Sequence, residues 1–192
     1  AFDTAPDSTL LDRGDPDRLP EGATEITAEY SVPFLAHATM EPLNATAHVT
    51  AEGLELWCGN QLPTYTRSAC AAEAGLPEDR VTVHTTLMGG GFGRRGELDF
   101  SVLATRVAKA LPGIPVMTTW SREEDMTHDF YRPAAIARMR GAVRDGTALL
   151  FDAAVAGPST ARQALDRWMG FAPPGPDKVH VEGLWNQPYA IP

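Results

Sequence analysis

A glycine-rich segment, "MGGGFGRRG" from Met88 to Gly96, constrains this chain more than any other feature. It follows a period-two pattern typical of a strand and precedes apolar residues spaced as on one face of a helix. Consecutive glycines have no Cβ, so the backbone can adopt positive φ and approach a ligand closely. The N–H groups of such a turn form a concave donor site for an oxyanion or phosphate. Either a ligand site or a purely structural turn is therefore expected, with Phe92 packing against a flat ring or filling the core.

One alternative is a dinucleotide-binding turn. Gly91, Gly93 and Gly96 match G-x-G-x-x-G between a strand and a helix, which is the context that fingerprint requires. Bulky residues stand where the fingerprint needs close backbone approach, and the next acidic pair, Glu123–Glu124, lies further on than the expected spacing of about 20 residues. A Walker loop is excluded because no Lys-Ser or Lys-Thr follows the glycines.

A second candidate site is "WCGNQLP", where a predicted strand ends at Gly59 just before a predicted helix. The side-chain amide of Asn60 or Gln61 could donate to an oxygen ligand while accepting from the backbone. The structural alternative is that Asn60 caps the helix and Gln61 is exposed.

Two other polar groups favour structural roles. His37 and Glu41, in "LAHATMEP", stand four residues apart, which is more typical of structural residues than of metal ligands. The remaining histidines lack the short spacing of a zinc site. The charged run "SREEDMTHDFYRP" is predicted to be a solvated, salt-bridged turn.

Along the chain, strand patterns outnumber helix patterns, which predicts an α+β fold: a two-layer sandwich with helices packed on one face of a mixed β-sheet. One helix is expected from Pro63 to a C-cap at Gly75, and another has Phe100, Leu103, Val107 and Leu111 on one stripe. Asp145–Gly146 predicts a hairpin. Residues 1–25 read as a linker and residues 26–192 as one domain. The predicted strands are residues 27–35, 45–50, 54–59, 79–87, 114–121, 134–143, 148–156 and, after a Pro-rich loop, 178–185.

Composition excludes several classes of protein. The 192 residues carry a net charge of −9, whereas nucleic-acid binding rests on clustered Lys and Arg. No apolar run long enough for a transmembrane segment occurs, and no signal-peptide pattern is present. The only cysteines, Cys58 and Cys70, are expected to be free thiols. Because the chain begins at Ala1 and stops at Pro192, it is expected to be a piece of a longer protein.

The ordered segments "AEYSVPFLAHATMEP", "LELWCGNQLP", "AGLPEDRVTVHTTLMGGGFGRR", "VMTTWSREEDM" and "PYAIP" resemble the molybdopterin-binding region of molybdenum hydroxylase large subunits, the xanthine dehydrogenase and aldehyde oxidase superfamily. The resemblance runs from about Ile26 to Pro192. It is strongest to the isoquinoline 1-oxidoreductase beta subunit and aldehyde dehydrogenase branch, because "GNQ" and "GGGFGRR" stand where xanthine dehydrogenases tend to have Thr-Gln and a Gly-Gly-Lys ending.

The resemblance implies specific roles for residues of this chain. Gln61 would hydrogen-bond an oxygen ligand of molybdenum, and Gly90, Gly91 and Gly93 would lie near the pterin. Phe92 would line the cofactor and the substrate approach. Arg94 would line the substrate, although Arg94 and Arg95 replace the Lys found in relatives. No residue would bind the metal directly, and no catalytic residue is expected in this fragment, because the family's general-base glutamate belongs to a later segment.

It also implies an activity and partners. The parent would be an oxidoreductase that hydroxylates aldehydes or N-heteroaromatics with water, using molybdenum and molybdopterin, expected in its cytosine dinucleotide form. Electrons would leave through iron–sulfur clusters of a small [2Fe–2S] subunit, and the isolated fragment would be inactive. The expected location is either the cytoplasm or the periplasm of a bacterium. A dinucleotide (NAD or FAD) domain using Gly91, Gly93 and Gly96, or a noncatalytic interaction domain, are the competing hypotheses.

Overall fold

The computed structural model describes residues 2–172 and 174–191, and its internal contacts divide the chain into two compact units. The first unit comprises Ala1–Leu35 and Arg132–Pro192, and the second comprises Ala36–Tyr131. Because the second unit is inserted between the two halves of the first, all the candidate site residues fall within one continuous stretch of sequence. The predicted boundary between residues 25 and 26 stays a prediction.

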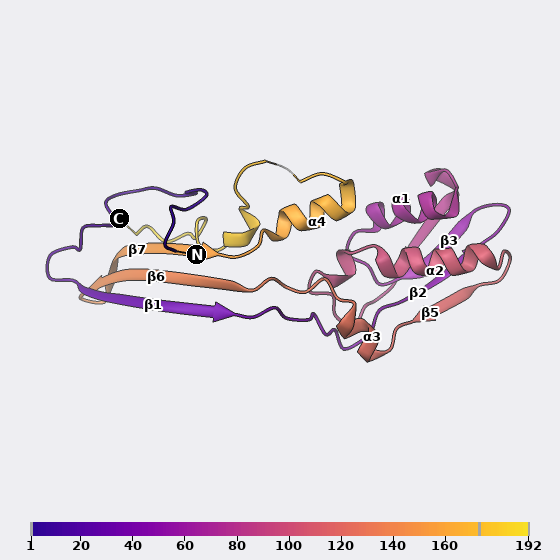
Figure 1. The fold of residues 1–192 in the computed structure, drawn as a ribbon, viewed down its shortest axis with the longest axis horizontal. Helices are drawn as coiled ribbons and strands as arrows, with labels where there is room; N and C mark the ends of the chain where they lie inside the picture. Colours follow the sequence, from indigo (N-terminus) through magenta and orange to yellow (C-terminus); the bar gives the residue numbers. More distant parts are fainter. Residues whose placement is uncertain (1, 173, 192) are drawn as a thin grey trace. The chain divides into compact units, whose positions relative to one another are not determined.

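The second unit is built on a four-stranded mixed sheet in the order β4-β3-β2-β5 (Figure 1). β3 and β4 are parallel, and the other pairs are antiparallel. Helices α1 and α2 pack against each other and against the sheet, so the α+β prediction, with helices on one face of a mixed sheet, is confirmed. The elements are β2 (Asn44–Val49), β3 (Leu54–Cys58), α1 (Pro63–Ala74), η1 (Glu78–Arg80), β4 (Val81–Thr85), η2 (Arg94–Gly96), α2 (Asp99–Ala110), β5 (Val116–Thr119) and α3 (Arg122–Thr127).

Helix α1 begins and ends where the sequence predicts. Pro63 occupies its first turn, where the missing N–H costs nothing. Gly75 closes it with φ 76°, and its N–H donates to Ala71 O and Ala72 O. Asn60 is not the cap, because the N-cap residue is Leu62 and it makes no side-chain cap hydrogen bond. The structural alternative for Asn60 is therefore wrong.

Helix α2 turns a different face to the core from the one predicted. Phe100, Ala104 and Ala108 are buried, whereas Leu103 and Val107 are about two-fifths exposed. Small side chains allow a helix to approach closely, and the facing strand β2 likewise buries Ala45 and Ala47. The predicted stripe was wrong beyond Phe100 because spacing alone does not distinguish a small-residue face from a large-residue face.

The first unit contains an antiparallel sheet in the order β1-β6-β7 (Figure 1). The predicted hairpin is confirmed: Asp145 and Gly146 join β6 to β7 with φ values of 51° and 76°, as such a two-residue turn requires. The strands expected from sequence are thus divided between two sheets, which the pattern did not indicate. The elements are β1 (Thr24–Val32), β6 (Ala135–Arg144), β7 (Thr147–Ala156), α4 (Thr160–Met169) and η3 (Val179–Val181).

Two predictions near the C-terminal end were wrong. The expected strand over residues 178–185 is a short 3-10 helix, η3, followed by turns, because the Asp177 carboxylate accepts from the N–H groups of Val179 and His180 and closes the backbone into a turn. The expected loop before it contains helix α4, which is capped by Ser159 Oγ accepting from Arg162 N and ended by Gly170.

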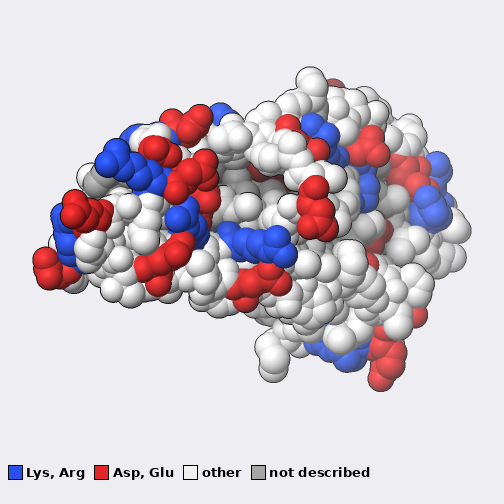
Figure 2. Space-filling model, turned by 60° about the vertical axis from the view of Figure 1, so that its left-hand side comes forward, with Lys and Arg blue, Asp and Glu red and all other residues white. Residues whose placement is uncertain are grey.

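Figure 2 shows acidic and basic side chains intermixed on the face that it draws. Among residues 2–172 and 174–191, no helix combines the length and apolar character that crossing a bilayer would require. Both cysteines are free, as predicted, and both are buried; burial raises the pKa of Cys58 to about 11. Neither thiol has the thiolate character of a reactive cysteine.

Candidate functional site: a glycine loop over two buried arginines

The glycine segment forms an irregular loop between β4 and the short helix η2. Gly90 and Gly93 have φ values of 102° and 103°, in the region that favours glycine. Phe92 also has a positive φ, 54°, and its side chain is 70% exposed. The interpretation of Phe92 as a core-filling residue is therefore wrong. Instead, the loop presents an aromatic ring at its surface beside bare backbone.

Gln61 is held against this loop at a fixed orientation. The N–H of Gly93 donates to Gln61 Oε1 over 3.1 Å, and the N–H of Gln61 donates to Arg95 O over 2.9 Å. A backbone N–H can only donate, so the atom that it meets must be the carbonyl oxygen of the side-chain amide. Gln61 is exposed, and its Nε2 has no hydrogen-bond partner among the described residues. The loop therefore presents an oriented N–H donor.

The close fit between Gln61 and Gly91 explains why that position lacks a side chain. A Cβ on Gly91 would lie 2.7 Å from Gln61 Oε1 and 2.9 Å from its Cδ, closer than real Cβ contacts. Neighbouring Asn60 is 3% exposed and donates from Nδ2 to Cys58 O and Thr85 Oγ1, each over 3.3 Å. Its Oδ1 is buried and accepts no hydrogen bond from the described residues.

Arg95 joins the loop to two other segments by hydrogen bonds. Its guanidinium is fully buried and donates from Nε to Gly90 O (2.9 Å), from Nη1 to Gly59 O (3.2 Å) and from Nη2 to both Glu41 O and Glu41 Oε2 (2.9 Å each). Three segments that are far apart in sequence thus meet at one side chain. Arg95 is a structural centre of the site.

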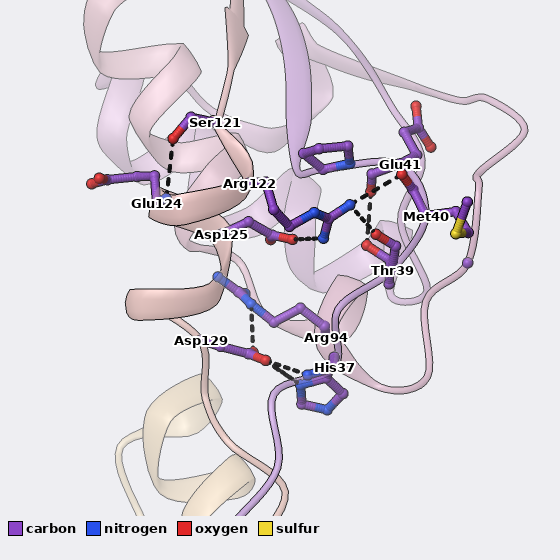
Figure 3. Close-up of polar contacts among 12 residues, drawn as sticks. His37, Thr39, Met40, Glu41, Arg94, Ser121, Arg122, Glu124, Asp125 and Asp129 are labelled. Carbon is purple, nitrogen blue, oxygen red and sulfur yellow. Dashed lines mark hydrogen bonds and ion pairs between the residues drawn. The ribbon is translucent and has the colours of Figure 1, made fainter.

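Arg94 is also buried, with 1% of its side chain exposed, and is ion-paired with both Asp99 and Asp129; Figure 3 shows the contact with Asp129. Its Nη1 and Nη2 donate to the two carboxylate oxygens of Asp99 over 2.8 Å each. Its Nε lies 3.0 Å from Asp129 Oδ1, an ion-pair contact outside hydrogen-bond geometry. The guanidinium also faces the rings of Trp120 and Phe130, at 5.5 and 5.1 Å from their centroids. Its expected contact with substrate stays a prediction, and the burial favours a positioning role.

The segment from His37 to Glu41 wraps this centre without forming a helix. His37 Nδ1 lies 2.9 Å from both carboxylate oxygens of Asp129. Arg122 donates to the backbone oxygens of Thr39 and Met40 and to Asp125 Oδ2 (Figure 3). His37 and Glu41 are structural neighbours of the loop rather than a pair, and no group of three or more His, Cys, Asp or Glu side chains suited to a metal ion occurs in the part of the chain that the structure describes.

The charged run after β5 was only partly predicted. It pairs charges, as expected, but it contains helix α3, capped by Ser121 Oγ accepting from Glu124 N. It is also less solvated than predicted, because Asp125 is 4% exposed and the Asp129 side chain 2%. The run is buried by contacts with distant segments: Arg122 donates to Thr39 O, and Asp129 is paired with the buried Arg94.

Glu41 provides a pH-dependent anchor for the loop. A hydrogen bond from the N–H of Gly89 (2.7 Å), with further help from Asn44 and Arg95 against the opposing effect of burial, holds the pKa of Glu41 below its usual value. A lowered folded-state pKa means that the anchor's contribution is present above the unfolded pKa of about 4.3 and is lost as the pH falls through the folded value.

We therefore expect the Gly89 amide resonance in an NMR titration to shift with a midpoint below about pH 4.3. In Glu41→Gln this transition of the Gly89 resonance should vanish, because the glutamine side chain does not titrate. A Gly89 midpoint at or above 4.3 in the unaltered chain would contradict the anchor.

The loop geometry does not favour a dinucleotide fingerprint. In that motif the glycines open the helix whose N-terminus receives the pyrophosphate. Here η2 intervenes, α2 begins only at Asp99, and the carboxylate of Asp99 is paired with Arg94 next to that helix end. A negative group already occupies the electrostatic position that a pyrophosphate would take.

Comparisons with known proteins agree with this geometry. The family described as molybdopterin cofactor-binding domain matches residues 2–167. The chain belongs to this family. It is 39% identical over 107 residues to the isoquinoline 1-oxidoreductase subunit beta of Brevundimonas diminuta, covering 55% of this chain and 14% of the relative. It is 30% identical over 125 residues to the aldehyde oxidoreductase molybdenum-binding subunit PaoC of Escherichia coli K12, covering 65% and 17%.

Solved structures give the same assignment for the fold. Quinoline 2-oxidoreductase from Pseudomonas putida 86 superposes with a TM-score of 0.59 and 25% identity, over 70% of this chain and 18% of that one. Aldehyde oxidoreductase from Desulfovibrio gigas superposes with a TM-score of 0.60 and 19% identity, over 76% and 16%. This molybdopterin-binding chain therefore corresponds to less than a fifth of the length of these relatives. Together with the family match, the similarity to these relatives in sequence confirms the expected membership of the molybdenum hydroxylase superfamily.

The loop fits a molybdopterin group on the structure's own terms. Glycines without Cβ leave backbone open to a planar ligand, an exposed Phe92 offers a ring face, and Gln61 offers a free donor. The buried Asn60 Oδ1 lacks a donor among the described residues. Sequence reasoning found the glycines, Phe92 and Gln61, but missed Arg95 and the His37–Asp129 contact, because their partners lie tens of residues away.

Proposed function

We propose that this molybdopterin-binding chain is part of the catalytic subunit of an oxidoreductase that hydroxylates aldehydes or N-heteroaromatics with oxygen from water. The family membership supports the cofactor class. The substrate class is supported by two relatives, one named for isoquinoline and the other for aldehydes. The chain alone covers too little of those relatives to carry the whole activity, so the proposal concerns the protein that contains it.

The observation that carries the proposal is the clamped carboxamide of Gln61. Its oxygen is occupied by the Gly93 N–H, which leaves Nε2 as a donor at the loop surface. An oriented donor at this place suits an oxygen atom of the cofactor. Preorganised donors of this kind stabilise developing charge without reorganising during the reaction.

The other site residues take supporting roles in the proposal. Gly90, Gly91 and Gly93 let the cofactor approach the backbone, and the exposed ring of Phe92 lines the cofactor and the approach of a flat substrate. Arg94 positions the loop through Asp99 and Asp129. The bound cofactor supplies the redox chemistry, while these residues bind and orient it. The general-base glutamate belongs to a later part of the protein, and we therefore expect the isolated chain to be inactive.

The cofactor form and the partner are also proposed. We assign the molybdopterin to its cytosine dinucleotide form, and we expect a small [2Fe–2S] subunit to carry electrons away from the site. The remainder of the large subunit would complete the cofactor pocket. These assignments rest on the resemblance of "GNQLP" and "GGGFGRR" to the isoquinoline 1-oxidoreductase branch.

The test is metal and pterin analysis of the large subunit that contains this chain, expressed with its iron–sulfur partner in a host that makes and inserts the cofactor. About one molybdenum and one pterin dinucleotide per subunit are expected. Gln61→Ala should remain folded but turn over on the order of a hundredfold more slowly, the usual cost of removing one such donor. Phe92→Ala should also lower turnover.

Matched controls come from the other unit. Gln163→Ala in α4 and Phe171→Ala remove an exposed amide and an exposed ring, and should leave turnover unchanged. A folded subunit without molybdenum in a competent host would refute the proposal. Equal turnover for Gln61→Ala and Gln163→Ala would refute the role given to Gln61.

A further inference from the structure

His37 is oriented by a buried carboxylate and faces the glycine loop. Its side chain is 9% exposed, and that of Asp129 is 2% exposed. Asp129 accepts from the His37 backbone N–H and from Nδ1 at 2.9 Å (Figure 3). On the other side of the ring, Nε2 is the nearest atom to the space in front of Gly93, 3.7 Å from where a Cβ on that glycine would be.

The contact with Asp129 determines which nitrogen of the neutral ring carries the proton. A carboxylate can only accept, so Nδ1 must donate to it. Nε2 then keeps its lone pair and is an acceptor. Among the described residues Nε2 has no hydrogen-bond partner, although Nδ1 of His37 and both carboxylate oxygens of Asp129 are engaged.

Both members of the His37–Asp129 contact are linked to the glycine loop, Asp129 through Arg94 and His37 through its position beside Gly93. Arg94 Nε lies 3.0 Å from Asp129, and the Arg94 backbone N–H donates to Gly91 O over 2.9 Å. Gly93, which His37 faces, donates its own N–H to Gln61 Oε1. The acceptor of His37 and the carboxamide of Gln61 therefore both lie beside the same glycine, Gly93.

We propose that His37 Nε2 accepts a hydrogen bond from the pterin part of the bound cofactor and that Asp129 is the positioning residue that sets its tautomer. An acceptor selects a ligand group that carries N–H or O–H. The amino and ring N–H groups of a pterin donate, whereas ionised phosphate oxygens only accept. This inference rests on the proposed function, because it assumes that the loop binds the molybdopterin.

Two substitutions of His37 separate a ligand contact from a structural one. The Asn amide reaches about as far as Nδ1, so His37→Asn keeps a donor for Asp129 and removes the acceptor near Gly93. The Gln amide reaches about as far as Nε2, so His37→Gln keeps an acceptor near Gly93. The measurement is the rate at which pterin is released from the purified large subunit on dilution, followed by pterin fluorescence, with folding checked by circular dichroism.

Loss of one hydrogen bond predicts about three- to tenfold faster release from His37→Asn, with His37→Gln within about twofold of the unaltered protein. A structural role predicts the reverse order, since Asn preserves the contact with Asp129. Faster release from Gln than from Asn, or equal rates for the two variants, would overturn the inference and leave the proposed function standing. A large subunit that contains no pterin at all would overturn both.

The tautomer provides an independent readout that needs no activity. A long-range proton–nitrogen spectrum of the 192-residue chain should place the His37 proton on Nδ1, with the ring signals assigned through the backbone resonances of His37. In Asp129→Asn the amide can donate to Nδ1, so the proton should move to Nε2 and pterin release should accelerate by about three- to tenfold. A proton on Nε2 in the unaltered chain, or unchanged release after the tautomer has switched, would overturn the inference even if the His37 variants fail to fold.

Discussion

Replacing Arg95 with Met is expected to lower the free energy of unfolding of the unit Ala36–Tyr131 by about 3–5 kcal/mol, the usual cost of breaking a buried charged network from one side. The guanidinium is fully buried and donates to Gly59 O, to Gly90 O, and to the backbone O and the carboxylate Oε2 of Glu41. Met retains much of the volume but supplies no donor. Buried oxygens that lose their partners pay the full desolvation cost.

Urea unfolding followed by circular dichroism would measure this change, with an unchanged slope showing that the compactness of the two states is not altered. Arg106→Met is the matched control. Arg106 is also paired with a glutamate, Glu73, at 2.8 Å, but its side chain is 62% exposed, so little or no change in the free energy of unfolding is expected. Similar losses for the two variants would show that Arg95 is not the structural centre of the loop.

Gly91→Ala is expected to reduce the cofactor content of the large subunit, or its turnover, by about ten- to a hundredfold while the fold is retained. The added Cβ would lie 2.7 Å from Gln61 Oε1, so the carboxamide must move and lose the Gly93 N–H. Gly91 is not among the glycines with positive φ, so backbone strain does not contribute. A loss of cofactor content or turnover in Gly91→Ala would therefore be caused by the displaced carboxamide of Gln61.

Gly141→Ala in β6 controls for the substitution itself. There the new Cβ would meet Leu150 O at 3.5 Å, an ordinary contact, and cofactor content should not change. Metal analysis, pterin fluorescence and circular dichroism on both variants would test the comparison. Full cofactor content and turnover in folded Gly91→Ala would contradict the orientation assigned to Gln61.

Local signals predicted much of the secondary structure. Helix α1 is specified by Pro63 and Gly75 at its ends, and the β6–β7 hairpin by Asp145–Gly146, because these residues act on their own backbone. The prediction of a strand at residues 178–185 was wrong because of another residue that acts on the nearby backbone. Asp177, one residue before it, accepts two backbone N–H groups and closes a turn that the alternation of Val179 and Val181 does not reveal.

Part of the candidate site was visible in the sequence as well. Gly90, Gly91 and Gly93 mark a loop that needs open backbone, and Gln61 stands at a strand end before a helix. Phe92 could not be placed from sequence, since a phenylalanine among glycines is compatible with either the core or the surface. The structure resolves this: Phe92 has a positive φ of 54° and its side chain is 70% exposed.

By itself, the sequence determined the family, the α+β class and the residues that line the loop, because these depend on residue type and on spacing within a few positions. Only the tertiary structure decided how the loop is held. Arg95 joins Gly59, Gly90 and Glu41, and Arg94 and His37 share Asp129. Hydrogen bonds between residues up to 92 positions apart depend on where the folded chain brings them, and buried charge is stable only where that arrangement supplies partners.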